Sequence, residues 1–239
     1  MRLLACLFLL PAWLVACCLA TFAEAPFRRG DLSGGHRFAR RFSWGCLRAM
    51  GIRMELQGLE HLESAQPCIY VANHQSNLDV LFHGRVYPPR TLVVGKREIA
   101  WIPFFGLMFR ITGNLLLDRR RRDSALAQMD KALEAMRERG ASIWVFPEGT
   151  RGRSEEMLPF KKGAFRLALA ARRPVVPVVL GRVADRVDVR RLHLSPGRLG
   201  LRILEPVDPA PYLPDRVDDL VAEVRRRMEE ARRQLAAES

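Results

Sequence analysis

Lysine is scarce in this sequence, and the cysteine patterns that mark metal sites or redox motifs are absent. The five cysteines form no CxxC pair and no metal-ligand spacing, which predicts buried, reduced thiols in a cytosolic protein. No period of about 20 to 50 residues repeats, which argues against a solenoid or a propeller. With 239 residues, 49% of them hydrophobic, the chain suits one domain of moderate size with a short appendage.

Arginine carries most of the positive charge. The formal net charge is +13, and the lysines are limited to Lys96, Lys131, Lys161 and Lys162. Such a surplus draws a protein towards a polyanion, which is either a nucleic acid or the anionic face of a membrane. The charge alone does not separate these partners, but the N-terminal segment favours a membrane lipid and argues against nucleic acid.

The first residues form a long apolar stretch without charge. It runs from Leu3 to Ala23, long enough as a helix to span a hydrocarbon core of about 30 Å, and Pro11 predicts a kink in it. Arginines crowd the trailing side, so the positive-inside rule places the body of the protein on the cytoplasmic face, of the inner membrane if the source is bacterial. We therefore predict a membrane anchor over residues 1–25 and a basic connector over residues 26–50. A signal peptide cleaved near Ala25, a segment lying in the interface and a bent re-entrant helix remain open alternatives.

Short apolar strands alternate with helices through most of the remaining chain. This order favours an α/β fold over residues 51–239, with a largely parallel mixed sheet covered by helices, preceded by the membrane-anchoring helix. The predicted strands are 52–57, 68–72, 91–95, 115–117, 142–146, 174–180 and 199–204. The predicted helices are about 35–50, 78–86, 124–139, 163–171 and 215–236. The apolar segment 101–109 is either core or a surface for lipid and acyl chains.

A histidine and an aspartate follow one predicted buried strand. His74 lies in the polar turn after that strand, and Asp79 lies in the first turn of the predicted helix. The two side chains can therefore meet, and the carboxylate would fix the imidazole tautomer that a general base needs. As an alternative, Ser76 and Asp79 match a capping box, in which Asp79 only secures the helix start and His74 is an ordinary loop histidine.

Candidate phosphate-binding residues follow other predicted strands. The run 146–152 offers Glu148, Gly149, Thr150 and Arg151. Glycine permits close approach of a ligand, and arginine is a two-pronged donor for phosphate. Arg119 ends another strand, and Lys161 precedes a predicted helix whose start would suit an anion. The alternatives are an ordinary polar turn, a solvated charge run and a helix boundary misplaced by one turn.

Taken in order, these segments resemble the 1-acylglycerol-3-phosphate acyltransferases within the wider glycerolipid acyltransferase superfamily. Residues 73–79 match the block N-H-x-S-x-x-D, and residues 113–119 match a glycine, an apolar strand and an arginine. Residues 146–152 match F-P-E-G-T-R-S, with Gly152 in place of serine, and residues 176–178 match a V-P-x block. Lys96 and its following residues also match. The likeness covers roughly residues 50 to 205, and four blocks in order are far more specific than any one of them.

The resemblance implies a membrane enzyme of phospholipid synthesis. It would transfer a fatty acyl group directly from acyl-CoA or acyl carrier protein to the sn-2 hydroxyl of 1-acylglycerol-3-phosphate (lysophosphatidic acid), without a metal or another cofactor. His74 would deprotonate the hydroxyl, and Asp79 would orient the imidazole. The implied acceptor-binding residues are Glu148, Gly149, Thr150, Arg151, Arg119, Lys96 and Lys161. The sequence has no nucleophilic serine elbow and no Cys–His arrangement, which agrees with direct attack. Another lyso-lipid acceptor, such as lyso-ornithine lipid, and a non-enzymatic basic protein are the alternatives.

Overall fold

A seven-stranded sheet forms the centre of the protein. The computed structural model describes residues 2–28, 30–118, 122–152, 156–189, 191–212 and 214–238. The strands of the sheet are β1 (Ile52–Gln57), β2 (Ile69–Ala72), β3 (Thr91–Lys96), β4 (Leu115–Leu117), β5 (Ser142–Val145), β6 (Val175–Leu180) and β9 (Gly197–Ile203). Their order is β1-β9-β6-β2-β5-β3-β4, and only the β6–β9 pair is antiparallel. The prediction of a largely parallel mixed sheet is confirmed.

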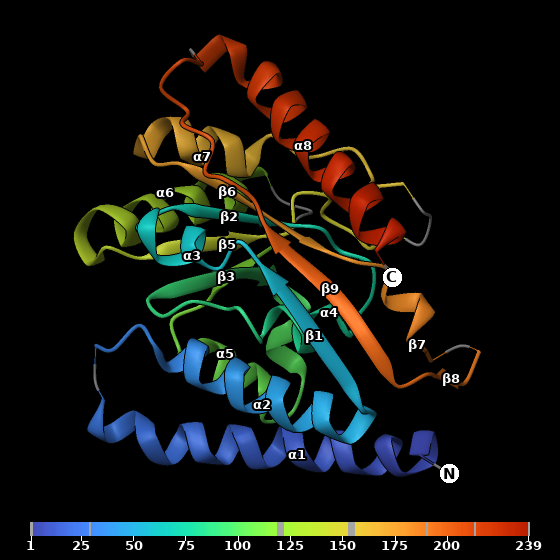
Figure 1. The fold of residues 1–239 in the computed structure, drawn as a ribbon. Coiled ribbons are helices and arrows are strands. Elements are labelled where there is room, and N and C mark those ends of the chain that lie inside the picture. Colours follow the sequence, from blue (N-terminus) through green and yellow to red (C-terminus); the bar gives the residue numbers. More distant parts are fainter. Residues whose placement is uncertain are drawn as a thin grey trace.

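Helices cover both faces of this sheet (Figure 1). One face packs against α1 (Arg2–Glu24), α2 (Gly34–Met50), α4 (Asp79–His83) and α5 (Phe105–Ile111). The other face packs against α6 (Arg122–Arg139), α7 (Gly163–Ala171) and α8 (Val217–Ala237). The protein therefore has two apolar cores, one on each side of the sheet.

Strand β2 shows why the central strands read as unbroken apolar runs. Successive side chains point to opposite faces of a strand, and both faces here are covered. Tyr70 and Ala72 join the core under α2 and α4, whereas Ile69 and Val71 join the core under α7 and α8. Every residue of β2 is buried.

The apolar N-terminal helix lies against the domain instead of projecting from it. In Figure 1, α1 runs antiparallel to α2 along the lower edge of the molecule. The Trp13 indole donates to the Arg41 carbonyl at 3.2 Å, and Glu24 pairs with Arg37 at 2.9 Å and with Arg41 at 2.7 Å. By length and composition alone, this is the one helix among the described residues that could cross a membrane. The predicted division into anchor, connector and domain stays a prediction.

Small elements that the sequence did not predict connect the larger ones. They are α3 (Glu60–Ser64), the short strands β7 (Val187–Asp188) and β8 (His193–Leu194), and the 3-10 turns η1 (Ala25–Phe27), η2 (Arg97–Trp101), η3 (Val183–Asp185) and η4 (Pro214–Arg216). Helix α5 was also not predicted. In the ambiguous segment 101–109, Met108 and Phe109 are buried in the core, whereas Trp101 and Phe104 are exposed. All five cysteines are buried and none is in a disulfide, as predicted.

Candidate functional site

Three loops meet where neighbouring parallel strands end. Residues 73–78 follow β2, residues 146–152 follow β5, and Gly181 follows β6. Because β6, β2 and β5 are adjacent and parallel, their carboxyl ends share one edge of the sheet. That edge is where open α/β sheets place their ligand sites.

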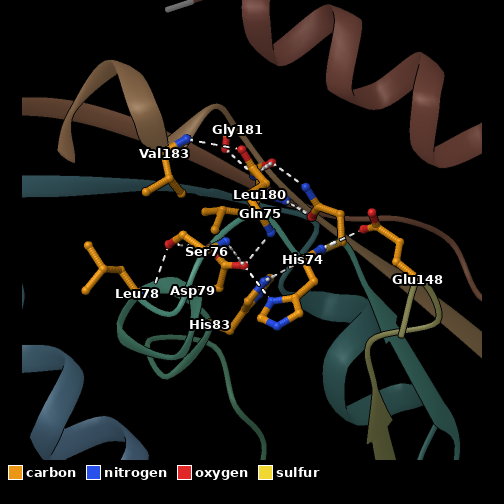
Figure 2. A network of polar contacts seen from close by, with 11 residues as sticks. His74, Gln75, Ser76, Leu78, Asp79, His83, Glu148, Leu180, Gly181 and Val183 are labelled. Carbon is orange, nitrogen blue, oxygen red and sulfur yellow. Dashed lines mark hydrogen bonds and ion pairs between the residues drawn. The ribbon is translucent and has the colours of Figure 1, made fainter. Parts of the chain in front are cut away.

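His74 and Asp79 form a hydrogen-bonded pair at this edge (Figure 2). The distance from His74 Nδ1 to Asp79 Oδ2 is 2.7 Å, and the Asp79 side chain is fully buried while that of His74 is 20% exposed. A carboxylate only accepts hydrogen bonds, so Nδ1 carries the imidazole proton. Nε2 then presents its lone pair, and no partner for it lies among the described residues. The sequence prediction that these two side chains meet is confirmed.

The Asp79 carboxylate also holds the turn that carries His74. Its Oδ2 accepts hydrogen bonds from the backbone N–H groups of Gln75 at 2.6 Å and Ser76 at 2.9 Å. The Ser76 hydroxyl lies 3.4 Å from Oδ1 and accepts the Leu78 N–H at 2.9 Å. One buried carboxylate thus fixes both the ring and the backbone of the catalytic candidate.

The loop after β5 is joined to His74 at its backbone. Glu148 Oε1 accepts the His74 N–H at 2.8 Å, and Glu148 Oε2 accepts the Leu158 N–H at 3.1 Å. The Gly152 N–H donates to the His74 carbonyl at 2.9 Å. Burial raises the pKa of the Glu148 carboxyl, against the lowering effect of these two N–H groups. Both predicted motif loops therefore dock on each other, and Glu148 works as their buried link.

The end of β6 holds the other side of the same turn. Asn73 pairs with the backbone of Leu180 through two hydrogen bonds of 2.9 and 2.8 Å. Gln75 donates to the carbonyls of Leu180 at 3.2 Å and Gly181 at 2.8 Å. The ring of Phe146 stacks on the His74 imidazole with centroids 4.4 Å apart. The imidazole is thus confined on its face and at its backbone, which is the preorganisation that a base requires.

The predicted phosphate-binding residues occupy different settings. Gly149 is buried in the left-handed region with φ +70°, and Lys161 packs over it. Thr150 and Arg151 are exposed, and Lys96 is half-buried at the end of β3. Arg119 lies outside the described residues. Lys162 pairs with Asp218 at 2.8 Å, so Lys161 is the lysine of this pair that faces the Gly149 loop.

A cavity of about 320 Å³ opens beside the Gly149 loop. Gly149, Lys161 and Gln128 give it a polar part, and its apolar wall comes from α6, α7 and the sheet. Phe146 lines it too, so the ring that stacks on His74 also borders this space. The arrangement suits a ligand with an anionic head and an apolar body.

Sequence reasoning did not identify Asn73, Phe146 or His83 as parts of this site. Asn73 and Phe146 belong to the recognised blocks, which was the only signal for them. His83 follows Asp79 by four residues on α4, and its Nε2 lies 3.3 Å from the Asn73 carbonyl. A histidine within an apolar helical stretch, spaced to share a face with Asp79, was the available signal.

Comparison with known proteins shows to which family the chain belongs. A family model described as Acyltransferase matches residues 53–181. The 1-acyl-sn-glycerol-3-phosphate acyltransferase of Escherichia coli (strain K12) is 38% identical over 196 residues, which are 82% of this chain and 77% of that protein. The chain belongs to the 1-acylglycerol-3-phosphate acyltransferase family. It is therefore an acyltransferase of phospholipid synthesis, as the four sequence blocks predicted.

Two further relatives extend this family likeness. The 1-acyl-sn-glycerol-3-phosphate acyltransferase alpha of Mus musculus is 39% identical over 179 residues, which are 74% of this chain and 63% of that protein. The crystal structure of the 1-acyl-sn-glycerophosphate (LPA) acyltransferase from Thermotoga maritima has a TM-score of 0.79 and covers 99% of this chain. This chain covers 95% of that structure at 24% identity, so the acyltransferase fold extends through the N-terminal helices.

Proposed function

We propose that this acyltransferase moves a fatty acyl group from acyl-CoA or acyl carrier protein to the sn-2 hydroxyl of 1-acylglycerol-3-phosphate, giving phosphatidic acid. The main support is the His74–Asp79 pair, whose free Nε2 lies at the strand edge beside the Gly149 loop. The names of the similar proteins from Escherichia coli and Mus musculus support this acceptor.

The proposed reaction is a direct transfer without an acyl-enzyme. Nε2 of His74 takes the proton of the acceptor hydroxyl as the oxygen attacks the thioester carbonyl. The carbon–sulfur bond then breaks, and the imidazolium returns the proton to the departing thiolate. Asp79 stabilises the transient imidazolium through the 2.7 Å contact to Nδ1. The Asp79 carboxylate forms no covalent bond with the substrate, and the proposed reaction needs no metal or other cofactor.

Acceptor recognition is assigned to the cationic groups around the Gly149 loop. Arg151 is exposed next to Gly152, whose N–H is bonded to the His74 carbonyl. Lys161 lines the cavity beside Gly149, and Thr150, Lys96 and Arg119 complete the set. A planar guanidinium and an ammonium together suit a phosphate monoester. Gly149 contributes backbone space, and Glu148 contributes by holding the loop against His74.

Membrane attachment is assigned to the face formed by α1, α2 and α5. Its exposed large apolar side chains include Leu7, Phe8, Leu9, Leu19, Trp44, Trp101, Ile102, Phe104 and Leu107. Exposed apolar side chains in this number suit contact with lipid, and the arginines of α2 suit anionic lipid heads. We assign the body of the protein to the cytoplasmic side.

The test combines one variant with a panel of acceptors. Full-length protein in membranes is assayed with acyl-CoA or acyl carrier protein as donor and with several lyso-lipids as acceptor. His74→Ala should lower kcat by about 10² to 10⁴. The matched control is His193→Ala, because His193 is an exposed histidine on β8. Wild-type turnover in His74→Ala would refute the base, and faster turnover of another lyso-lipid would refute the acceptor.

A further inference from the structure

A second histidine lies directly behind the first. His83 is the last residue of α4, is only 3% exposed, and is drawn beside Asp79 in Figure 2. Its Nε2 lies 3.3 Å from the Asn73 carbonyl. That carbonyl belongs to the peptide bond whose N–H, on His74, donates to Glu148.

His83 is a neutral donor in this position. A carbonyl only accepts, so Nε2 carries the proton of the ring. Nδ1 is buried with no hydrogen-bond acceptor beside it among the described residues, which agrees with a ring that carries no proton on Nδ1. Burial lowers the pKa of His83 to about 4, despite the opposing attraction of Asp79. His83 therefore places no positive charge beside the imidazolium that forms on His74 during transfer.

The ring of His83 also supports the aromatic surface under His74. Its centroid lies 5.4 Å from that of Trp144 and 5.5 Å from that of Phe146. Phe146 in turn stacks on His74 at 4.4 Å. Two separate paths, one through the Asn73 carbonyl and one through Phe146, thus connect His83 with His74.

We infer that His83 is a positioning residue for His74, fixing the 73–74 peptide plane by its hydrogen bond and supporting Phe146 by its ring. This inference rests on the proposed role of His74 as the base. Glu148 accepts the His74 N–H, Gly152 donates to the His74 carbonyl, and the Asn73 side chain ties the turn to Leu180. His83 supplies the contact at the Asn73 carbonyl.

Three variants separate a positioning role from a structural one. His83→Phe keeps a ring but removes the donor. His83→Gln keeps an amide N–H near the place of Nε2. Tyr87→Phe is the matched control, because Tyr87 is also buried, also packs on Trp144 at 5.5 Å, and donates to a carbonyl, that of Thr91, at 2.6 Å.

Full-length protein is assayed with the lyso-lipid that the wild type turns over fastest. If that lipid is not 1-acylglycerol-3-phosphate, the proposed acceptor is wrong, but the role of His83 is still tested. We expect His83→Phe to lower kcat about tenfold, equivalent to about 1.4 kcal/mol in the barrier, with KM changed less than about twofold. His83→Gln should recover most of kcat. Tyr87→Phe should keep kcat within about twofold of wild type, although it should lose about as much thermal stability as His83→Phe.

A substrate-free readout distinguishes failure of this inference from failure of the proposed function. In the NMR spectrum of protein with labelled histidine rings, the Nδ1–H signal of His74 should broaden or vanish in His83→Phe and persist in Tyr87→Phe. Wild-type kcat together with an unchanged signal in His83→Phe would overturn the inference. A loss of kcat in Tyr87→Phe as large as in His83→Phe would also overturn it. If His83→Phe does not fold, His83→Asn replaces it, because the shorter amide does not reach the Asn73 carbonyl.

Discussion

Replacing Asp79 with asparagine removes one charge from the centre of the site while keeping its shape. Asp79 Oδ2 accepts hydrogen bonds from His74 at 2.7 Å, Gln75 at 2.6 Å and Ser76 at 2.9 Å, and an amide oxygen in its place accepts the same three. The change therefore leaves the turn formed and removes the attraction between the carboxylate and the imidazolium of the transition state. Two unit charges about 4 Å apart attract by about 4 kcal/mol at an effective dielectric constant of about 20.

That attraction sets the expected loss of rate. About 4 kcal/mol in the barrier corresponds to a kcat about 10³ lower for Asp79→Asn, while KM should stay close to wild type. The assay follows thiol release from acyl-CoA with 1-acylglycerol-3-phosphate, alongside the melting temperature. Ser76→Ala is the control, since its hydroxyl touches the same carboxylate at 3.4 Å but does not contact His74. It should lower kcat less than about tenfold, because this hydroxyl reaches only Oδ1, the oxygen that does not bind His74, at a long 3.4 Å. A kcat within tenfold of wild type in a folded Asp79→Asn protein would refute the reasoning.

Three further changes test the scaffold of the site. Asn73→Ala leaves two buried backbone groups of Leu180 without the Asn73 amide and should lower the free energy of unfolding by about 2–4 kcal/mol in urea denaturation. Gly149→Ala should lower it by about 1–2 kcal/mol because φ is +70°, whereas Gly163→Ala, at the start of α7 with open space around it, should be neutral or stabilising. Burial lowers the pKa of His83 from 6.5 to about 4, so the unfolded state binds more protons than the folded state between these pH values. The effect of His83 on the free energy of unfolding is therefore absent above pH 6.5, and it lowers that free energy by about 3 kcal/mol as the pH drops to about 4. His83→Gln should remove that part of the acid sensitivity, measured as melting temperature against pH.

The strands were predictable because burial on two faces leaves a plain signature. The runs that became β2, β5 and β6 are short, apolar and bounded by polar turns, which is the pattern of central parallel strands. The direction of β9 was not predictable in the same way. Its side chains alternate between buried and mostly half-buried positions, a pattern that fits either orientation, and its antiparallel pairing with β6 depends on the connection between the two strands. The described part of that stretch contains the two-residue strands β7 and β8 and the turn η3 as its only regular elements.

The site was predictable where the contact is local and less so where it crosses the sheet. His74 and Asp79 are close in sequence, so their spacing in a turn was enough to predict a contact. The resemblance assigns Glu148 to the acceptor site, and in the structure its two oxygens also accept the N–H groups of His74 and Leu158. That use of the carboxylate depends on β2 and β5 being neighbours, a pairing of residues more than seventy positions apart that sequence spacing does not encode.

The two interpretations of Asp79 offered by the sequence turn out to be compatible. A capping role predicts a carboxylate bonded to backbone N–H groups, and a catalytic role predicts a carboxylate bonded to an imidazole. Asp79 Oδ2 fills both roles, because this one atom accepts hydrogen bonds from Gln75, Ser76 and His74. An oxygen that accepts two N–H groups of a rigid turn has little freedom to move, so the imidazole bonded to it is also fixed in direction. The spacing of five residues between His74 and Asp79 is therefore the length of turn that lets one carboxylate bind its own loop and the ring at the start of that loop.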